Sequence, residues 1–137
     1  CTGGGLGATL TALPKASDAF IGGVIAYNNS IKQKLLGVPE ELISKYGAVS
    51  QSVVKAMAKG ARKQLHSDWA IAISGLAGPN GGTKFKPVGT VHIAVAGPKG
   101  CKSNAKEFGA RRQRIEIQKL SILKALDRLR LCMLKQS

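Results

Sequence analysis

The sequence is poor in acidic residues, aromatic residues and cysteine, and it contains no long apolar run. Its 137 residues include 7 Asp and Glu against 21 Lys and Arg, and only 4% are aromatic. No apolar run approaches the roughly 20 residues that a membrane-spanning helix requires. The cysteines Cys1, Cys101 and Cys132 form no CxxC pair, and the chain has two histidines, His66 and His92. This set argues against a disulfide framework and predicts no metal site.

The length and the apolar content indicate one compact domain over residues 1–137. Hydrophobic residues make up 44% of the chain and charged residues 20%, which is typical of a folded protein rather than a disordered tail. No linker divides the sequence, and we expect a cytoplasmic protein with free thiols. Because the chain opens on Cys1 rather than methionine, we expect a fragment or a trimmed product.

Positive charge is the strongest feature of the composition. The formal net charge is +14; residues 1–83 carry a net of +4 and residues 84–137 a net of +10. Such a field attracts anions, including nucleic acid and phosphorylated small molecules. Six aromatic residues are few for reading bases by stacking, so nucleic acid is possible but not favoured. The alternative is a basic surface that only keeps the protein in solution.

Apolar periodicity and capping residues predict helices and strands that alternate along the chain. The predicted helices cover residues 2–13, 31–36, 39–46, 50–66 and 113–134. The predicted strands cover residues 20–27, 69–74, 88–96 and 101–108. The segment 20–27 is apolar and rich in β-formers, which predicts a buried strand, and lysines in 101–108 suit an exposed edge. This alternation predicts a layered α/β sandwich.

Two glycine-rich loops lie beside predicted strands and helices, at residues 1–5 and 74–83. Ligands of α/β proteins bind at strand ends, where such loops gather. Neither loop has the Gly-Lys-Ser/Thr ending of a P-loop, so the phosphate signal is weak. The alternative for residues 74–83 is a long flexible connection.

Seven stretches along the chain resemble the CinA C-terminal domain family. They are Cys1-Thr2-Gly3-Gly4, residues 21–29 with Lys32, Gly37-Val38-Pro39, residues 46–50, residues 57–60, residues 74–82 and residues 86–91. They follow one another in order and at matching spacing over nearly the whole chain. The glycine-rich loop together with Lys86-Pro87-Val88-Gly89-Thr90-Val91 is specific to this family.

The resemblance implies a fold, an activity and partners. The implied fold is a three-layer α/β/α sandwich. The implied activity, that of the PncC-type amidohydrolases, hydrolyses the carboxamide of nicotinamide mononucleotide (NMN) to nicotinic acid mononucleotide and ammonia. The family needs no metal, and we expect no cofactor. We expect a small nucleotide substrate, no membrane partner, and a homodimer or larger homo-oligomer.

The resemblance also assigns the site residues, because the family is described as a serine–lysine hydrolase. It implies Ser17 as nucleophile, Lys32 as catalytic lysine and Tyr27 as a further catalytic residue. The expected substrate-binding residues are Thr2, Gly3, Gly4, Ser74, Gly75, Gly78 and Arg112. A serine hydroxyl needs a base, and a lysine serves as that base only when its pKa is lowered by burial or neighbouring cations.

Taken without the family, the same residues have simpler interpretations. Ser17 suits a helix cap, Lys32 a solvated helix face, Tyr27 a strand end and Ser74 a turn. The expected phosphate-contacting arginine could be any of Arg111, Arg112 and Arg114, and spacing from Phe108 favours Arg112.

The chain also departs from the family pattern at two places. Lys15 stands where the family has glycine, which strains the backbone if that position needs a positive φ. The Glu-Ser pair that precedes Cys-Thr-Gly-Gly in the family, with the helix and strand before it, is absent, so we expect a sheet strand and part of the pocket wall to be missing. An inactive scaffold and a nucleic-acid-associated competence protein therefore remain alternatives.

Overall fold

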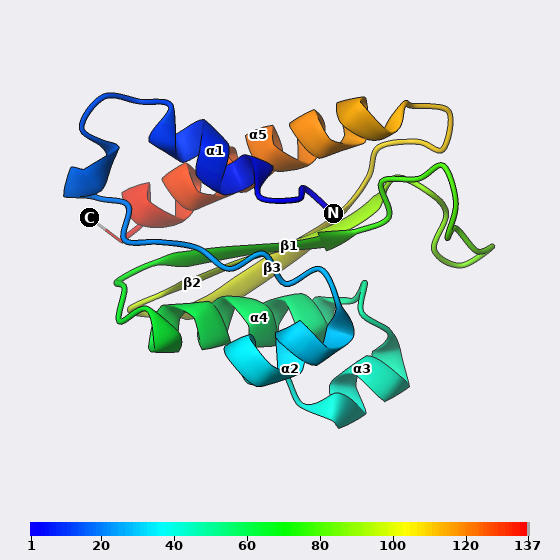
Figure 1. Cartoon of the computed structure of the whole chain (residues 1–137), viewed down its shortest axis with the longest axis horizontal. Helices are drawn as coiled ribbons and strands as arrows, with labels where there is room; N and C mark the ends of the chain where they lie inside the picture. The colour runs from blue at the N-terminus through cyan, green and yellow to red at the C-terminus, as the bar shows by residue number, and fades with distance from the viewer. Residues whose placement is uncertain (137) are drawn as a thin grey trace.

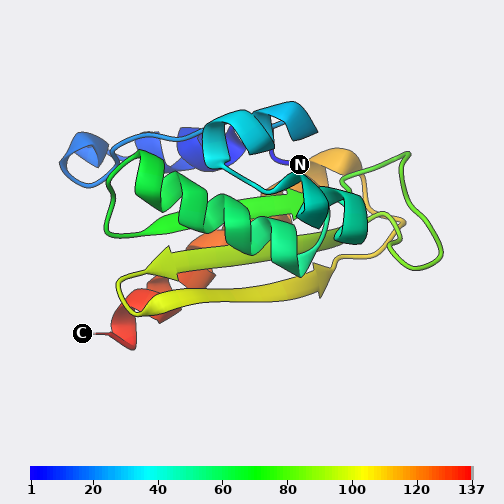
Figure 2. The ribbon, with the colours of Figure 1, turned by 90° about the horizontal axis from the view of Figure 1, so that it is seen from below.

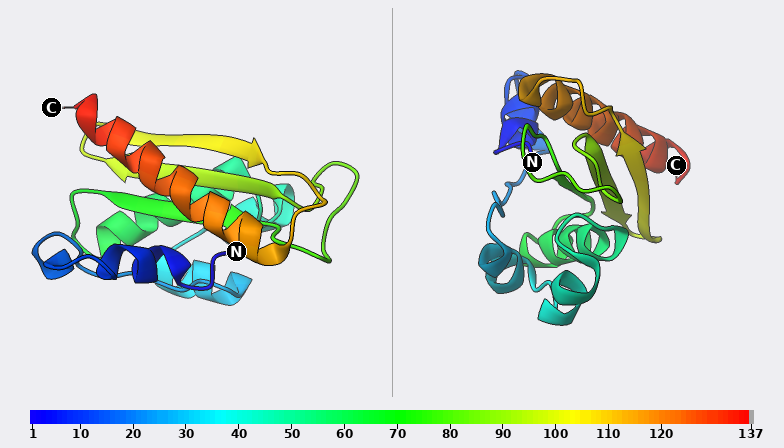
Figure 3. Two further views of the ribbon diagram at one scale, coloured as in Figure 1. Left: turned by 90° about the horizontal axis from the view of Figure 1, so that it is seen from above. Right: turned by 90° about the vertical axis from the view of Figure 1, so that its right-hand side faces the viewer.

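The computed structural model describes residues 1–136 and places them in three layers, with a sheet between two layers of helices (Figure 1). The sheet contains β1 (Ala70–Gly75), β2 (Thr90–Gly97) and β3 (Gly100–Glu107). One face carries α1 (Gly5–Thr11) and α5 (Arg114–Leu134), and the other carries α2 (Asn29–Leu36), α3 (Glu40–Tyr46) and α4 (Gln51–Gln64). Figures 2 and 3 show the same layers from three other directions. The predicted α/β/α sandwich is confirmed.

The sheet is antiparallel, with strand order β1-β2-β3. Ser74 on β1 pairs with His92 on β2, and Ala96 on β2 pairs with Cys101 on β3. The two-residue period of the strands divides their side chains between two cores. Small residues such as Ala94 pack with α4, whereas Ile93 packs with α5.

Local signals place the helices on the α4 face close to their predicted bounds. The Ser50 hydroxyl accepts from the backbone N–H of Val53 and caps α4, whose buried stripe includes Met57. The Asn28 side chain accepts from the Ser30 N–H and caps α2, which ends at Gly37 with φ 63°. Each cap satisfies a backbone group that the first helical turn leaves without a partner, so the helix begins where the sequence predicts.

The predicted strand over residues 20–27 is wrong, because this segment is extended but joins no sheet. Its residues alternate between exposed and half-buried, as in a strand, yet residues 21–26 make no backbone hydrogen bond within the described chain. A cavity of about 530 Å³ separates the segment from β1 and is lined by both. Strands pair only at about 5 Å, so the cavity prevents pairing with β1.

The buried face of α5 leaves out some of its large apolar residues. Ile115 and Met133 are both exposed. The helix instead buries Ile117, Ser121, Ala125 and Cys132. Small residues let α5 lie close to the sheet, which an apolar count alone does not reveal. Within residues 1–136, no helix is both long and apolar enough to span a membrane.

Candidate functional site

Lys32 is a buried lysine that has no acidic partner among residues 1–136. Its side chain lies on the inner face of α2, with 6% of the residue exposed. The Nζ donates to the Tyr27 carbonyl oxygen at 3.3 Å and to Asn29 Oδ1 at 3.5 Å. Both acceptors are neutral, and burial lowers the pKa of Lys32 below its ordinary value of 10.5. A lysine in this environment can hold its unprotonated form closer to neutral pH.

A close contact between two helices keeps Lys32 pointing inward. Lys32 and Leu36 lie four residues apart on the same face of α2, and both are buried. α2 crosses α4 where Gly60 faces the backbone of Leu36 so closely that a Cβ at position 60 would collide with the Leu36 carbonyl. Gly60 therefore sets how near α2 approaches α4, and with it the depth of Lys32.

Arg114 lies at the site, whereas Arg112 does not. At the start of α5, Arg114 Nη1 donates to the Gly78 carbonyl at 2.7 Å and Nη2 to the Tyr27 hydroxyl at 3.3 Å. Arg112 Nε donates to the Phe108 carbonyl at 2.7 Å and is exposed. Spacing from Phe108 could not separate the two, because the α5 capping box of Gln113 and Glu116 decides which arginine falls inside the first helical turn.

The loop Cys1 to Gly4 lies against α5, close to Lys32 and Arg114. Gln118 Nε2 donates to the Cys1 carbonyl at 3.0 Å and ties the loop to α5. Cys1 lies within range of the charges of Lys32 and Arg114, so the three residues lie close together. Gly4 caps α1 with φ 91°. Thr2, Gly3 and Gly4 follow Cys1 directly in this loop, and their role in substrate binding stays a prediction.

The loop after β1 supplies a further wall. Ser74 is buried and its hydroxyl donates to the Ala48 carbonyl at 2.7 Å, on the α4 side of the sheet. Gly75 has no room for a side chain against Val91. Gly78 has φ 79° and offers its carbonyl to Arg114. The structure therefore brings Gly78 to Arg114 and Tyr27, while the Ser74 hydroxyl is held by the backbone before α4.

Two residues near Ser74 were not among the predicted site residues. His92 pairs with Ser74 in the sheet, and burial and then the charge of Lys86 lower its pKa. Lys86 Nζ donates to the Tyr46 carbonyl at 2.6 Å. In residues 88–96, Thr90 and His92 alternate with apolar residues and so share one face of the strand. This pattern was the signal in the sequence that could have indicated His92. Lys86 lies in a loop, whose course the sequence pattern does not define.

Ser17 is not brought to Lys32 within one chain. It is exposed in the short helix η1 (Ala16–Asp18), which precedes the extended segment, whereas Tyr27 and Lys32 follow it. Figures 1 and 3 show η1 at one end of the molecule and α2 toward the other, with residues 20–27 between them. Seven extended residue steps span roughly 23 Å at about 3.3 Å per residue.

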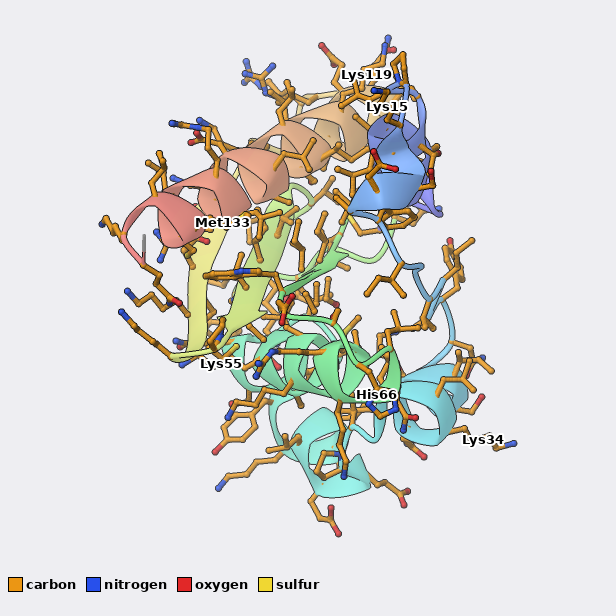
Figure 4. The ribbon with its side chains drawn as sticks, turned by 90° about the vertical axis from the view of Figure 1, so that its left-hand side faces the viewer. Lys15, Lys34, Lys55, His66, Lys119 and Met133 are labelled. Atoms are coloured by element: carbon orange, nitrogen blue, oxygen red, sulfur yellow. The ribbon has the colours of Figure 1, made fainter. Side chains whose placement is uncertain are left out.

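Lys15, which stands where the family has glycine, adopts a left-handed backbone conformation. Its φ is 61° and it caps η1, so the strain expected of a non-glycine residue at this position is present. Figure 4 shows Lys15 beside the α1 and α5 layer, on the same side of the molecule as Lys119.

The cavity between segment 20–27 and β1 is lined by neither Lys32 nor Ser17. The space of about 530 Å³ is lined by the 20–27 segment, by α1 and by the inner faces of α4, β1 and α5. Tyr27 and the Cys1 to Gly4 loop border it, but Lys32 and Ser17 do not. Its walls are mainly apolar, which suits an apolar occupant better than a charged mononucleotide. Among residues 1–136, no three His, Cys, Asp or Glu side chains gather closely enough to hold a metal ion.

Comparison with known proteins assigns this arrangement to a family. The model of the CinA C-terminal domain matches residues 1–133. A CinA-like protein of Parasynechococcus marenigrum (strain WH8102) is 61% identical over the whole chain, which covers 33% of that protein. A CinA-like protein of Prochlorococcus marinus (strain MIT 9313) is 59% identical, with 32% of its length covered. The chain thus spans about a third of the length of these relatives.

Solved structures show the same fold. The competence/damage inducible protein CihA of Agrobacterium tumefaciens has a TM-score of 0.91 and 35% identity, over 94% of this chain and 78% of that one. A competence-damaged protein (CinA) superfamily protein of Escherichia coli has a TM-score of 0.89 and 31% identity, over 94% and 74%. On the family match and these relatives, the chain belongs to the CinA family and carries its C-terminal domain.

Proposed function

We propose that this domain is an amidohydrolase that releases ammonia from nicotinamide mononucleotide, with Lys32 as general base and a water molecule as nucleophile. Ser17, the predicted nucleophile, lies at the other end of segment 20–27 from Lys32 within one chain. The observation that carries the proposal is the buried Lys32, whose Nζ donates to two neutral oxygen atoms and has no carboxylate partner within the described residues. A structural lysine at such depth would be expected to pair with a carboxylate, because an isolated buried charge is costly. A lysine that must take up a proton during a reaction needs the lowered pKa that burial provides here.

The groups around Lys32 suit an anionic substrate. Arg114 keeps N–H groups beyond the two that bind Gly78 and Tyr27, and guanidinium groups bind phosphate oxygens well. The backbone of Thr2, Gly3 and Gly4 lies close by and offers N–H groups for a phosphate or for the developing oxyanion. We therefore assign the phosphate to Arg114 in place of Arg112.

The proposed reaction balances in atoms and charge. The oxygen of a water molecule adds to the carboxamide carbon while one of the water's protons passes to Lys32 Nζ. The C–N bond then breaks as that proton moves to the leaving nitrogen, which departs as ammonia, and the acid product leaves.

The test is ammonia release from nicotinamide mononucleotide by the wild-type chain and by Ser17→Ala, Lys32→Ala and Lys34→Ala. Lys34 is the matched control, because it lies two residues away on α2 and points out of the molecule (Figure 4). Loss of a general base typically lowers the rate by 10²- to 10⁴-fold. We expect that loss for Lys32→Ala and no loss for Ser17→Ala or Lys34→Ala. Full activity of Lys32→Ala would refute the assignment.

A second candidate, DNA binding, rests on the charge. The described residues 1–136 form one ion pair, between Arg130 and Asp127, although the chain carries a net charge of +14. DNA binding through phosphates weakens steeply as salt increases. It would be unaffected by Ser17→Ala, and an affinity no greater than that of a lysine-rich control protein would exclude it.

A further inference from the structure

A second cavity lies at the end of the sheet opposite to the candidate site. Its volume is about 530 Å³, and it lies between the C-terminal half of α4 and the turn that joins β2 to β3. Figures 1 and 2 show this end of α4 and this turn at one end of the molecule, and the loop between β1 and β2 at the other. Ala96, which lines the cavity, pairs with Ala70 at the start of β1, whereas Ser74 lies near the end of that strand. The two sites are therefore separate.

Basic side chains converge on this cavity. Four of its lining residues come from α4 and the turn that ends it, and they are Lys59, Arg62, Lys63 and His66. The last three follow the first by three, four and seven residues, which places all four along one face of the helix. Among the described residues that line the cavity, none is acidic. Three cations and a histidine around one hollow create a positive field that attracts anions.

The guanidinium of Arg62 is held in a fixed orientation. Its Nε donates to the Asp68 carbonyl at 2.9 Å, and the residue is half-buried. The two terminal nitrogens carry the remaining N–H groups, and a guanidinium presents such groups in pairs to phosphate oxygen atoms. Because one bond already fixes the side chain, less rotational freedom is lost when an anion binds.

His66 occupies a position at which glycine is usual. It follows the last turn of α4, at the end that faces the viewer in Figure 4. The helix is closed by bonds from the His66 N–H to the Lys63 carbonyl at 3.4 Å and from the Ser67 N–H to the Arg62 carbonyl at 3.2 Å. This closure requires a left-handed residue, and the φ of His66 is 49°. A side chain in that conformation is strained, and such strain gathers at functional sites.

Helix polarity explains only part of this cluster. Cations in the last turn of a helix stabilise it by interacting with its dipole, and Arg62 and Lys63 lie in the last turn of α4. The effect falls off within that turn, so it does not account for Lys59. It also gives no reason for a strained histidine in place of glycine at position 66.

We propose that this cavity binds the phosphate groups of a small phosphorylated molecule, with Lys59, Arg62, Lys63 and His66 as its ligands. A diphosphate carries several negative charges and so matches a cluster of this size. A hollow of about 530 Å³ has the volume of a small-molecule site, whereas a nucleic acid backbone is bound by cations spread along its length. The inference does not depend on the proposed amidohydrolase activity, because the two sites lie at opposite ends of the sheet.

Titration with sodium pyrophosphate, followed by NMR of the isotope-labelled chain at constant ionic strength, tests the site. We expect saturating shifts of backbone amides within residues 59–67 and 97–101. Arg62→Gln and Lys59→Gln should each weaken binding about 10- to 100-fold, as expected for the loss of one charged hydrogen bond. Lys59 is exposed, so its variant keeps the test valid if Arg62→Gln fails to fold.

The matched control is Lys124→Gln, which removes the same charge from an exposed position on α5. It should bind pyrophosphate as tightly as the wild type. Shifts that do not saturate, or equal weakening in the control, would overturn the proposal, because both results indicate attraction by net charge alone.

His66→Gly separates a binding role from a structural one. Glycine relieves the left-handed strain, so the melting temperature should rise, while loss of the imidazole should weaken pyrophosphate binding. A variant that is more stable and binds as tightly as the wild type would overturn the assignment of His66 as a ligand.

A single-stranded thymidine oligonucleotide without terminal phosphates distinguishes the two sources of phosphate. It offers only backbone phosphates, and we expect it to leave the amides of the cavity unshifted at the concentration at which pyrophosphate saturates them. Binding of the oligonucleotide that Arg62→Gln abolishes, together with no saturation by pyrophosphate, would overturn the assignment to a small molecule.

Discussion

Arg114 donates its Nη2 to the Tyr27 hydroxyl at 3.3 Å, which joins the start of α5 to the end of an extended segment 87 residues earlier. If Arg114 binds the substrate phosphate, Arg114→Gln removes a charge-assisted hydrogen bond of about 1.5 to 3 kcal/mol. We expect KM for nicotinamide mononucleotide to rise about 10- to 100-fold, with a smaller change in kcat. Steady-state ammonia release measures both constants. Arg112→Gln, which leaves Arg114 intact, should match the wild type, and the reverse result would return the role to Arg112.

The buried Lys32 predicts how stability depends on pH. Its pKa is lower in the folded chain than the ordinary 10.5, so between those two pKa values the unfolded chain binds more protons. The free energy of unfolding therefore rises as pH increases toward 10.5. Urea unfolding at a series of pH values should show this rise for the wild type and a weaker one for Lys32→Met.

The control for this effect is Lys34→Met, which removes an exposed lysine from the same helix. Its pH dependence should follow that of the wild type. A Lys32→Met chain whose stability changes with pH as steeply as the wild type would show that Lys32 is not the group responsible. The same variant should remain folded, because methionine fills a similar volume without a charge to desolvate.

Lys15 predicts a stabilising substitution. Its φ of 61° strains the backbone by about 1 to 2 kcal/mol, which glycine would relieve. Part of this gain is lost because glycine gives the unfolded chain more conformational freedom. Lys15→Gly should raise the free energy of unfolding by about 0.5 to 1 kcal/mol, measured by urea denaturation. Lys15→Ala removes the charge but keeps the strain, so it separates the two causes. Equal stabilisation by alanine would attribute the effect to charge.

Gly60 predicts a destabilising substitution that also disturbs the site. A Cβ there collides with the Leu36 carbonyl, so Gly60→Ala must push α2 away from α4. Overpacking of this kind costs about 1 to 3 kcal/mol. Thermal unfolding should show the loss, and Lys32 should become less buried, which raises the pH at which half of the activity is reached. Lys63→Ala on the exposed face of α4 should leave both unchanged.

Local chemistry in the sequence was sufficient to predict most of the elements. Side-chain caps at Asn28 and Ser50, the Gly37 stop and the stripe of α4 act within a few residues, so they survive in any tertiary setting. The predicted strand over residues 20–27 is wrong because a strand depends on a distant partner. Its composition favours a strand, but a strand needs a partner edge at hydrogen-bonding distance, and that partner lies across a cavity.

The sequence by itself determined the family, the layered fold and the set of residues from which a site can be built. Only the tertiary structure decided which of them meet. It placed Arg114 rather than Arg112 against Tyr27, buried Lys32 on the inner face of α2, and held Ser17 at the far end of an extended segment. The physical reason is that a motif records spacing along the chain, whereas proximity, burial and the resulting pKa depend on how distant segments pack.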